Sequence, residues 1–488
     1  MFSEASSGSS SSNLDLFSSA TTAATRGLAG GLRRPLGSIG STASSISASL
    51  LYGTSTEEKV VLDIGSYTLR AGFSGDTAPL HKTPLHGGFT AVRPTGRLEG
   101  KAPAGLFENG IESEELLDAL LLEQLREIYR RHLLLDSKSR KVAIVENALL
   151  PIQVKRSLAR VLLGNLRVPQ LTFYPSSVAA LMTCGIMDGL VVDCGHRSTV
   201  VTPVYDGRPM LTYVISTPVG GHALFQNLRK LLLRFGRFTP FSTDAAASAT
   251  GSPNEGNAQG GSSVAVSEDI LSDEVVEFLK TKLLYVSPLS VPASFGTPPV
   301  GLGVGMVGDD LVEWFESSVT ASSERTRMTI GGRPSGRARG VLEFPSWIRE
   351  RASEILFYGD SVQDHRGIVD VLAQCIARVP VDTRRALAKK ILMVGGVADM
   401  PNVRVRVLHD LVSRLRVDAR WAVLADDLAL AEEPGNGNEV SSANGATFPS
   451  SNRNWVGASL ATAAKIGGVD VKPEDFDGYK LPDWTTTY

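Results

Sequence analysis

The pattern of apolar and polar positions along this chain predicts an α/β protein. Short apolar runs typical of buried strands alternate with stretches that repeat apolar residues at helical spacing. This order favours a mostly parallel or mixed sheet with helices on its faces. The clearest helix is expected from Ser113 to His132, with Ser113 as N-cap. Strands are expected at 60–64, 142–145, 171–174, 190–193 and 391–394, and further helices at 151–163, 176–184, 384–390 and 455–464.

Two of these strands end in the same turn. Each runs into an aspartate, Asp63 or Asp193, and a glycine follows two residues later, Gly65 or Gly195. A second apolar strand follows each turn. Glycine lets the backbone turn so that its N–H groups face an anion, while the carboxylate holds a metal or its water. We therefore expect two facing hairpins that hold a phosphate chain, although an aspartate that satisfies an ordinary turn is the simpler alternative.

A third strand, Ile391–Val394, runs into Gly395 and Gly396. This backbone is flat enough for a purine to lie against, and a simple entry turn to a helix is the alternative.

Composition narrows the classes of protein. The chain has 488 residues, 42% hydrophobic and 20% charged, which fits a soluble globular protein of two or three domains. A net charge of −2 argues against nucleic acid as the main partner. Cys184, Cys194 and Cys375 suggest neither a disulfide framework nor a zinc site, and they are most simply buried small residues. The sequence lacks an apolar run of about 18 residues, so we expect no membrane span.

Over about residues 58–484, these pieces in this order resemble the actin superfamily. The first hairpin lies in 63–79, the second in 190–207, and the segments 280–286 and 393–396 look like those on the adenosine side. The resemblance implies an actin-like ATPase fold: two ribonuclease-H-like α/β domains around a cleft for ATP or ADP with Mg²⁺, which Asp63 and Asp193 contact through water. The nucleotide contacts it implies are Asp63, Gly65, Ser66, Tyr67, Arg70, Asp193, Gly195, His196, Gly220, Lys280, Thr281, Gly395, Gly396, Val397 and Met400.

The departures from actin concern catalysis first. The glutamine that orients the attacking water in actin falls on Ser176, and the histidine that helps to polarise it falls on Val200. A serine is too short for that role, and positioning supplies most of the catalysis in phosphoryl transfer. We assign no catalytic residue and expect nucleotide binding with little or no hydrolysis.

Other departures change the walls of the cleft. Tyr67 replaces a small residue, and Arg70 replaces the lysine that pairs with phosphate; a surface position is the alternative for Arg70. His196 and Arg197 replace an Asp-Gly pair, and a solvated or packed His196 is expected rather than a catalytic one. On the adenosine side, the replaced residues are a glutamate, a tyrosine and a lysine, at Thr281, Met400 and Ser451.

The stretch at 80–107 is shorter than the small subdomain of actin and lacks its hydrophobic loop. A subunit without one of the two contacts of a polar filament joins an end but does not propagate it. With the tail at 471–478, this is most similar to the actin-related proteins at the pointed end of dynactin, called ten in fungi and eleven in animals. The resemblance implies a cytoplasmic, cytoskeletal cap whose partners are dynactin's filament-forming actin-related protein and its other pointed-end subunits. An actin-like ATPase and a subunit of a nuclear chromatin-remodelling complex are the alternatives.

The expected domain organisation follows from composition and resemblance together. Residues 1–50 are rich in Ser, Ala and Gly and are expected to form a disordered head; a transit peptide is disfavoured because of Glu4 and Asp15. The first actin-like domain is expected at 51–188, with its shortened small subdomain around 80–107. The second is expected at 189–464, with flexible insertions at 241–267 and 287–341, and a tail at 465–488 packs back on the first domain.

Overall fold

The structure is a computed structural model that describes residues 58–85, 114–241, 263–287, 324–330, 339–360, 363–431, 448–477 and 481. The expected head (1–50), the N-cap Ser113 and most of the shortened subdomain (80–107) lie outside the described residues. All described residues belong to one unit of the chain, Thr56–Tyr488. Within the described ranges, no helix has the length and hydrophobicity needed to span a bilayer. The domain boundaries proposed above stay predictions.

The first sheet has six strands in the order β15-β5-β4-β1-β2-β3. Strands β1, β4 and β5 run parallel, and the other neighbours pair antiparallel. Every residue of β1 and β4 is buried, because helices cover both faces of the sheet there. The strands are β1 (Val60–Ile64), β2 (Thr68–Phe73), β3 (His81–Pro84), β4 (Val142–Glu146), β5 (Leu171–Pro175) and β15 (Val469–Val471).

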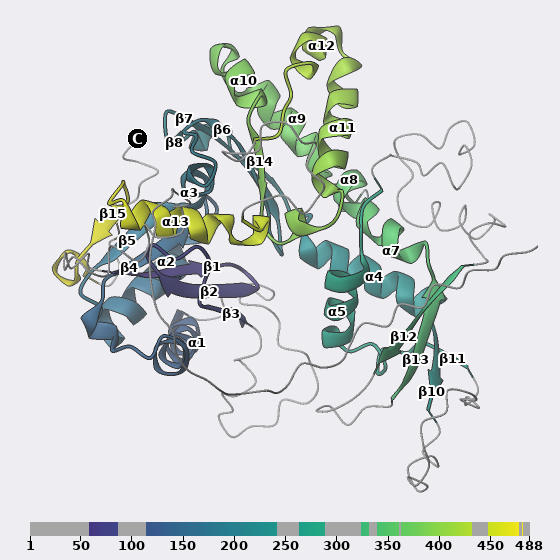
Figure 1. Cartoon of the computed structure of the whole chain (residues 1–488), viewed down its shortest axis with the longest axis horizontal. Coiled ribbons are helices and arrows are strands. Elements are labelled where there is room, and N and C mark those ends of the chain that lie inside the picture. Colours follow the sequence, from purple (N-terminus) through teal and green to yellow (C-terminus); the bar gives the residue numbers. More distant parts are fainter. Residues whose placement is uncertain are drawn as a thin grey trace, which may run out of the picture. The chain divides into compact units, whose positions relative to one another are not determined.

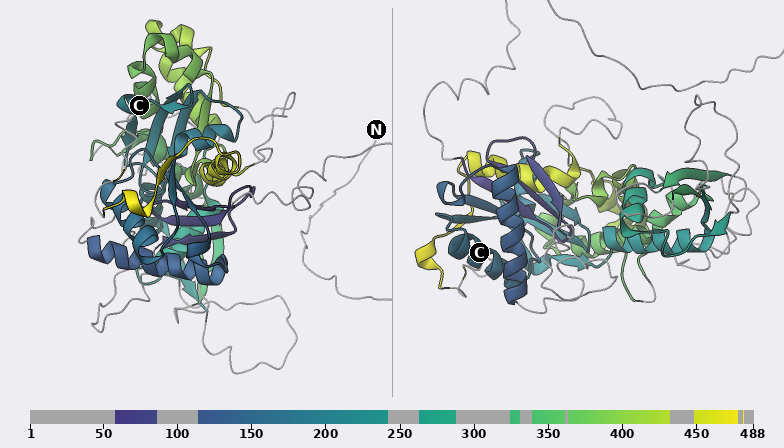
Figure 2. Two further views of the ribbon diagram at one scale, coloured as in Figure 1. Left: turned by 90° about the vertical axis from the view of Figure 1, so that its left-hand side faces the viewer. Right: turned by 90° about the horizontal axis from the view of Figure 1, so that it is seen from below.

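Helices α1 (Glu114–Glu127) and α2 (Ile152–Ala159) pack on one face of this sheet, and a π-helical turn continues each of them, at Ile128–His132 and Arg160–Asn165. Helices α3 (Ser176–Met182) and α13 (Arg453–Ala463) cover the other face. Figures 1 and 2 show α13 and β15, both yellow, beside the strands of this sheet. The apolar residues of β1 therefore alternate between two separate cores.

The second sheet has the order β14-β6-β7-β8, and β9 also pairs with β7. Helices α9, α10 and α11 pack on one face, and α12 packs on α11. Helix α3 lies against the other face, so it contacts both sheets. The elements are β6 (Gly189–Cys194), β7 (Thr199–Tyr205), β8 (Arg208–Pro209), β9 (Ile215–Thr217), β14 (Ile391–Val394), α9 (Ile368–Arg378), α10 (Val381–Ala388), α11 (Val403–Arg416) and α12 (Ala419–Ala425).

A third sheet has the order β11-β10-β13-β12 and packs with α4 and α5 around a separate core. Its elements are α4 (Gly221–Phe235), β10 (Arg237–Pro240), β11 (Val264–Ala265), α5 (Asp273–Leu283), β12 (Arg325–Ile330), β13 (Gly340–Pro345), α7 (Ile348–Arg351) and α8 (Ile355–Tyr358). Single 3₁₀ turns lie at Ser137–Ser139, Leu211–Tyr213, Ala352–Glu354, Val397–Asp399, Ser450–Asn452 and Pro473–Asp475.

Parts of the two expected insertions form strands of this sheet. The interval 241–267 contains β11, and 287–341 contains β12 and the start of β13. The pattern of β12 was hard to recognise because arginines occupy its outward face. Arg325 and Arg327 lie 3.6 and 2.8 Å from carboxylate oxygens of Glu343 on β13. Residues 242–262, 288–323 and 331–338 lie outside the described ranges.

Candidate nucleotide cleft

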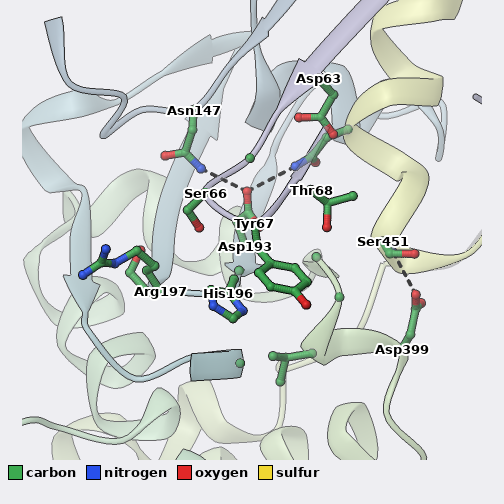
Figure 3. A pocket seen from close by; sticks show the side chains of 18 of the residues that line it. Asp63, Ser66, Tyr67, Thr68, Asn147, Asp193, His196, Arg197, Asp399 and Ser451 are labelled. Atoms are coloured by element: carbon green, nitrogen blue, oxygen red, sulfur yellow. Dashed lines mark hydrogen bonds between the residues drawn. The ribbon is translucent and has the colours of Figure 1, made fainter. Parts of the chain in front are cut away.

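A cavity of about 990 Å³ opens at the ends of β1, β6 and β14 (Figure 3). Its walls come from both hairpins, from the first turn of α4, from α5 and from the segment that follows β14. The carboxyl ends of β1 and β4, and of β6 and β14, point toward this cavity, which is where α/β sheets bind ligands. The cleft lies at the position that the sequence predicts for a nucleotide.

The two hairpins that border the cleft have the same geometry. In the first, the N–H of Gly65 donates to the carbonyl of Thr68 at 2.9 Å, and in the second the N–H of Gly195 donates to the carbonyl of Ser198 at 3.0 Å. The strand registers match as well, because Asp63 lies opposite Arg70 and Asp193 lies opposite Val200. A side chain at either glycine would lie about 3.1 Å from the carbonyl across the turn. The predicted duplication is present in the structure, residue for residue.

The two aspartates have different partners. Asp63 is 8% exposed, and its Oδ2 lies 2.8 Å from Nη1 of Arg70. Asp193 has no cation opposite it; its Oδ2 accepts hydrogen bonds of 3.1 Å from the amides of Asn147 and Asn454 (Figure 3). Burial raises the pKa of Asp63, against the opposing charge of Arg70. Burial and then the charge of Asp63 raise the pKa of Asp193 to about 6.

The tips of the hairpins touch through two rings. Tyr67 stacks on His196, with ring centroids 4.3 Å apart and planes 21° apart. His222, in the first turn of α4, meets His196 edge to face at 5.5 Å, and its backbone N–H donates to the carbonyl of His196 at 2.6 Å. His196 therefore packs between a ring of the first hairpin and a ring of α4.

The first turn of α4 supports the second hairpin. The N–H of Gly221 donates to the carbonyl of Gly195 at 3.0 Å. A side chain at Gly220 would lie 2.8 Å from that carbonyl oxygen, so the close approach requires glycine. Gly220, predicted as a nucleotide contact, is not among the residues that line the cleft, whereas Gly221 is. The role of Gly220 in the structure is to let the helix approach the turn.

Helix α5 presents Lys280 and Thr281 to the cleft. The Nζ of Lys280 lies 2.6 Å from a carboxylate oxygen of Glu277 and donates to the carbonyl of Gly221 at 3.3 Å. Burial lowers the pKa of Lys280, against the effect of Glu277. The hydroxyl of Thr281 donates to carbonyls one turn back in its own helix, Glu277 and Phe278.

The segment after β14 forms the opposite wall. Gly395 has φ +93°, and a side chain there would overlap the carbonyl of Cys194, so this position needs glycine on both counts. A side chain at Gly396 would meet only open space, which leaves room beside the backbone for a base. Val397 and Met400 continue this wall.

Ser176 and Val200 also line the cleft, and both are buried, at 7% and 3% exposed. Ser176 is the first residue of α3, and Val200 lies opposite Asp193. Both residues therefore line the cavity; the side chain of Ser176 is a short hydroxyl, and that of Val200 carries no hydrogen-bonding group.

Several residues of the cleft were missing from the sequence-based site. Asn147 follows β4, the parallel neighbour of β1, and that position alone could have drawn attention to it. Asn454 precedes Trp455, whose indole donates to the carbonyl of Val61 at 3.0 Å and so fixes α13 on β1. Lys82, Glu277 and Asp399 carry no local motif, and only the fold brings them to the cleft.

The residues present suit a nucleotide with its metal. Two buried carboxylates and the orphaned buried Oδ1 of Asn454 supply the oxygen atoms that Mg²⁺ prefers. Among the described residues, no cluster of three or more His, Cys, Asp or Glu is arranged to hold a metal by itself. This fits Mg²⁺ that is held through water and phosphate oxygens. When bound, the ion would neutralise phosphate charge.

The mixed α/β sheets and the paired hairpins define an actin-like fold. The family model for actin matches residues 54–291. The chain is 23% identical to actin-related protein 4 of Arabidopsis thaliana over 77% of its length and 89% of that protein. It is 23% identical to centractin of Saccharomyces cerevisiae over 75% of its length and 86% of that protein. It is also 26% identical to actin-related protein 10 of Dictyostelium discoideum, but over 36% of its length and 40% of that protein. Fold, motifs and comparisons together support an actin-related protein.

Proposed function

We propose that this actin-related protein binds ATP or ADP with Mg²⁺, hydrolyses little or none of it, and serves as a structural subunit. The observation that carries the proposal is the contrast within the cleft. Both hairpins keep their aspartates in matching register, while Ser176 and Val200 occupy the positions where water would be oriented. A site that grips phosphate without steering water retains its ligand instead of cycling it.

The assembly we propose is the short actin-like filament of dynactin, with this chain as the cap of its pointed end. Its partners are then the filament-forming actin-related protein and the other pointed-end subunits, in the cytoplasm, in support of dynein-driven transport along microtubules. Three features support this: the shortened stretch at 80–107, the tail at 471–478, and the partial match to actin-related protein 10.

Nucleotide retention tests the cleft. Asp193→Ala removes the carboxylate that accepts hydrogen bonds from the amides of Asn147 and Asn454. We expect the purified variant to lose most of its nucleotide. Asp426→Ala is the matched control, because Asp426 is an exposed aspartate that pairs with Arg416 at 2.9 Å outside the cleft lining. The content of ATP and ADP is measured by chromatography after denaturation. Equal nucleotide in both variants would remove the cleft assignment.

Affinity purification of the full chain, followed by mass spectrometry, tests the assembly. Recovery of dynactin's filament-forming subunit and its pointed-end subunits supports the cap. Recovery of chromatin-remodelling subunits, together with accumulation of the protein in the nucleus, would instead support a subunit of a nuclear chromatin-remodelling complex. Self-assembly of the isolated chain with steady phosphate release would replace it by a cycling ATPase.

A further inference from the structure

The stacked rings of Tyr67 and His196 join the two hairpin turns across the cleft. Each ring comes from within its turn: Tyr67 lies between Gly65 and Thr68, and His196 lies between Gly195 and Ser198. Ring centroids 4.3 Å apart with planes 21° apart are in direct face-to-face contact. A phosphate group does not fit between two rings at that distance. We call this pair the ring clasp.

Neighbouring elements support both rings. Behind His196, the ring of His222 lies edge-on, and the first turn of α4 is hydrogen-bonded to the turn itself. On the side of Tyr67, the Nζ of Lys280 lies 5.9 Å from the ring centroid. Lys280 is itself held by Glu277. Moving either ring therefore disturbs packed contacts on α4 or α5, so the clasp resists opening.

The basic and acidic side chains that line the cleft balance each other in number. The lining has four basic side chains and four acidic ones. Two of the basic side chains already have acidic partners, Arg70 with Asp63 and Lys280 with Glu277. A terminal phosphate would bring further negative charge close to two buried aspartates. The number of charges in the lining is therefore balanced, and the steric contact between the two rings carries the argument.

We propose that the ring clasp closes the phosphate end of the cleft, so that the site takes a nucleoside diphosphate in preference to a triphosphate. This proposal rests on the proposed function, namely that the cleft binds nucleotide. The two hairpins are then bridged by side chains where a terminal phosphate would otherwise bridge them.

Calorimetric titration of the full chain with Mg²⁺-ADP and with a non-hydrolysable Mg²⁺-ATP analogue tests the clasp. For the unmodified chain we expect the diphosphate to bind at least about tenfold more tightly. Tyr67→Gly and His196→Ala should each bring the two affinities to within about threefold. Tyr67→Phe keeps the ring and should keep the preference.

A second stacked pair provides the matched control. His81 and His132 have ring centroids 3.4 Å apart and do not line the cleft. His132→Ala therefore removes a stack of the same kind and should leave the preference unchanged. Equal or tighter binding of the triphosphate analogue by the unmodified chain overturns the clasp alone, and so does an unchanged preference in both Tyr67→Gly and His196→Ala. Failure of every variant to bind either nucleotide overturns the proposed function together with the clasp.

Discussion

The two hairpins share their register and their turn but neutralise their aspartates differently. In the first, the residue opposite Asp63 is Arg70, and the two form a buried ion pair. In the second, the residue opposite Asp193 is Val200, and amides from Asn147 and Asn454 take the place of a cation. The first hairpin is therefore complete within itself, whereas the second depends on two other segments of the chain.

This difference shows how one motif can carry two roles. An aspartate held by two neutral amides has no cation in direct contact, so a metal ion with its water shell can compensate its charge. An aspartate that already pairs with a cation, as Asp63 does with Arg70, attracts a metal ion less strongly and contributes more to the stability of the fold. Burial first, and then the charge of Asp63, raise the pKa of Asp193 to about 6, so a bound cation would stabilise its ionised form.

Breaking the first hairpin should have the largest effect. Arg70→Ala leaves Asp63 buried without its cation, which lowers the free energy of unfolding by about 3 kcal/mol or more. The control is Arg140→Ala, which removes a partly exposed pair with Glu58 and should cost less than about 1 kcal/mol. Denaturant unfolding measures both. If the two variants lose a similar amount of unfolding free energy, the buried pair of the first hairpin has no special role in stability.

Removing one amide from the second hairpin should have an intermediate effect. Asn454→Ala leaves Asp193 with one donor in place of two and should cost about 1.5–3 kcal/mol, the usual value for a hydrogen bond to a charged group. Asn165→Ala, at an exposed position, is the control. A thermal unfolding series in the presence and absence of Mg²⁺ reports the effect. If Asn454→Ala behaves like the control, the amides do not hold the carboxylate.

Replacing Ser176, the position where the resemblance places the water-orienting glutamine of actin, should have the smallest effect. Ser176→Gln supplies an amide at the start of α3, but Val200 still offers no hydrogen bond on the opposite side. We expect phosphate release to remain at the level of the unmodified chain, as measured by a coupled phosphate assay. Rapid hydrolysis by the unmodified chain itself would refute the inactive-site argument.

Sequence patterns predicted the strands at the centre of the cleft well, because buried parallel strands appear as uninterrupted apolar runs. They also located both hairpin turns and the glycines after β14. They failed at β12, where arginines on the outward face of a strand looked like a loop, and at β11, which is only two residues long.

The remaining part of the site could not be read from local sequence for a physical reason. Asn147 and Asn454 reach Asp193 from segments 46 and 261 residues away along the chain. Lys82 reaches the cleft only through strand pairing and the hairpin fold. No spacing rule links such residues, whereas the Asp-x-Gly turns are fixed by neighbours three to five residues apart.

Strand β15, which forms one edge of the first sheet, has a consequence for folding during synthesis. Strand β15 pairs with β5, and Thr172 donates to the carboxylate of Asp470, 298 residues further along. During synthesis, this edge of β5 therefore stays without its partner strand until residues 469–471 have left the ribosome. An exposed edge invites pairing with other chains. Chains truncated before residue 469 should aggregate more readily than the 488-residue chain.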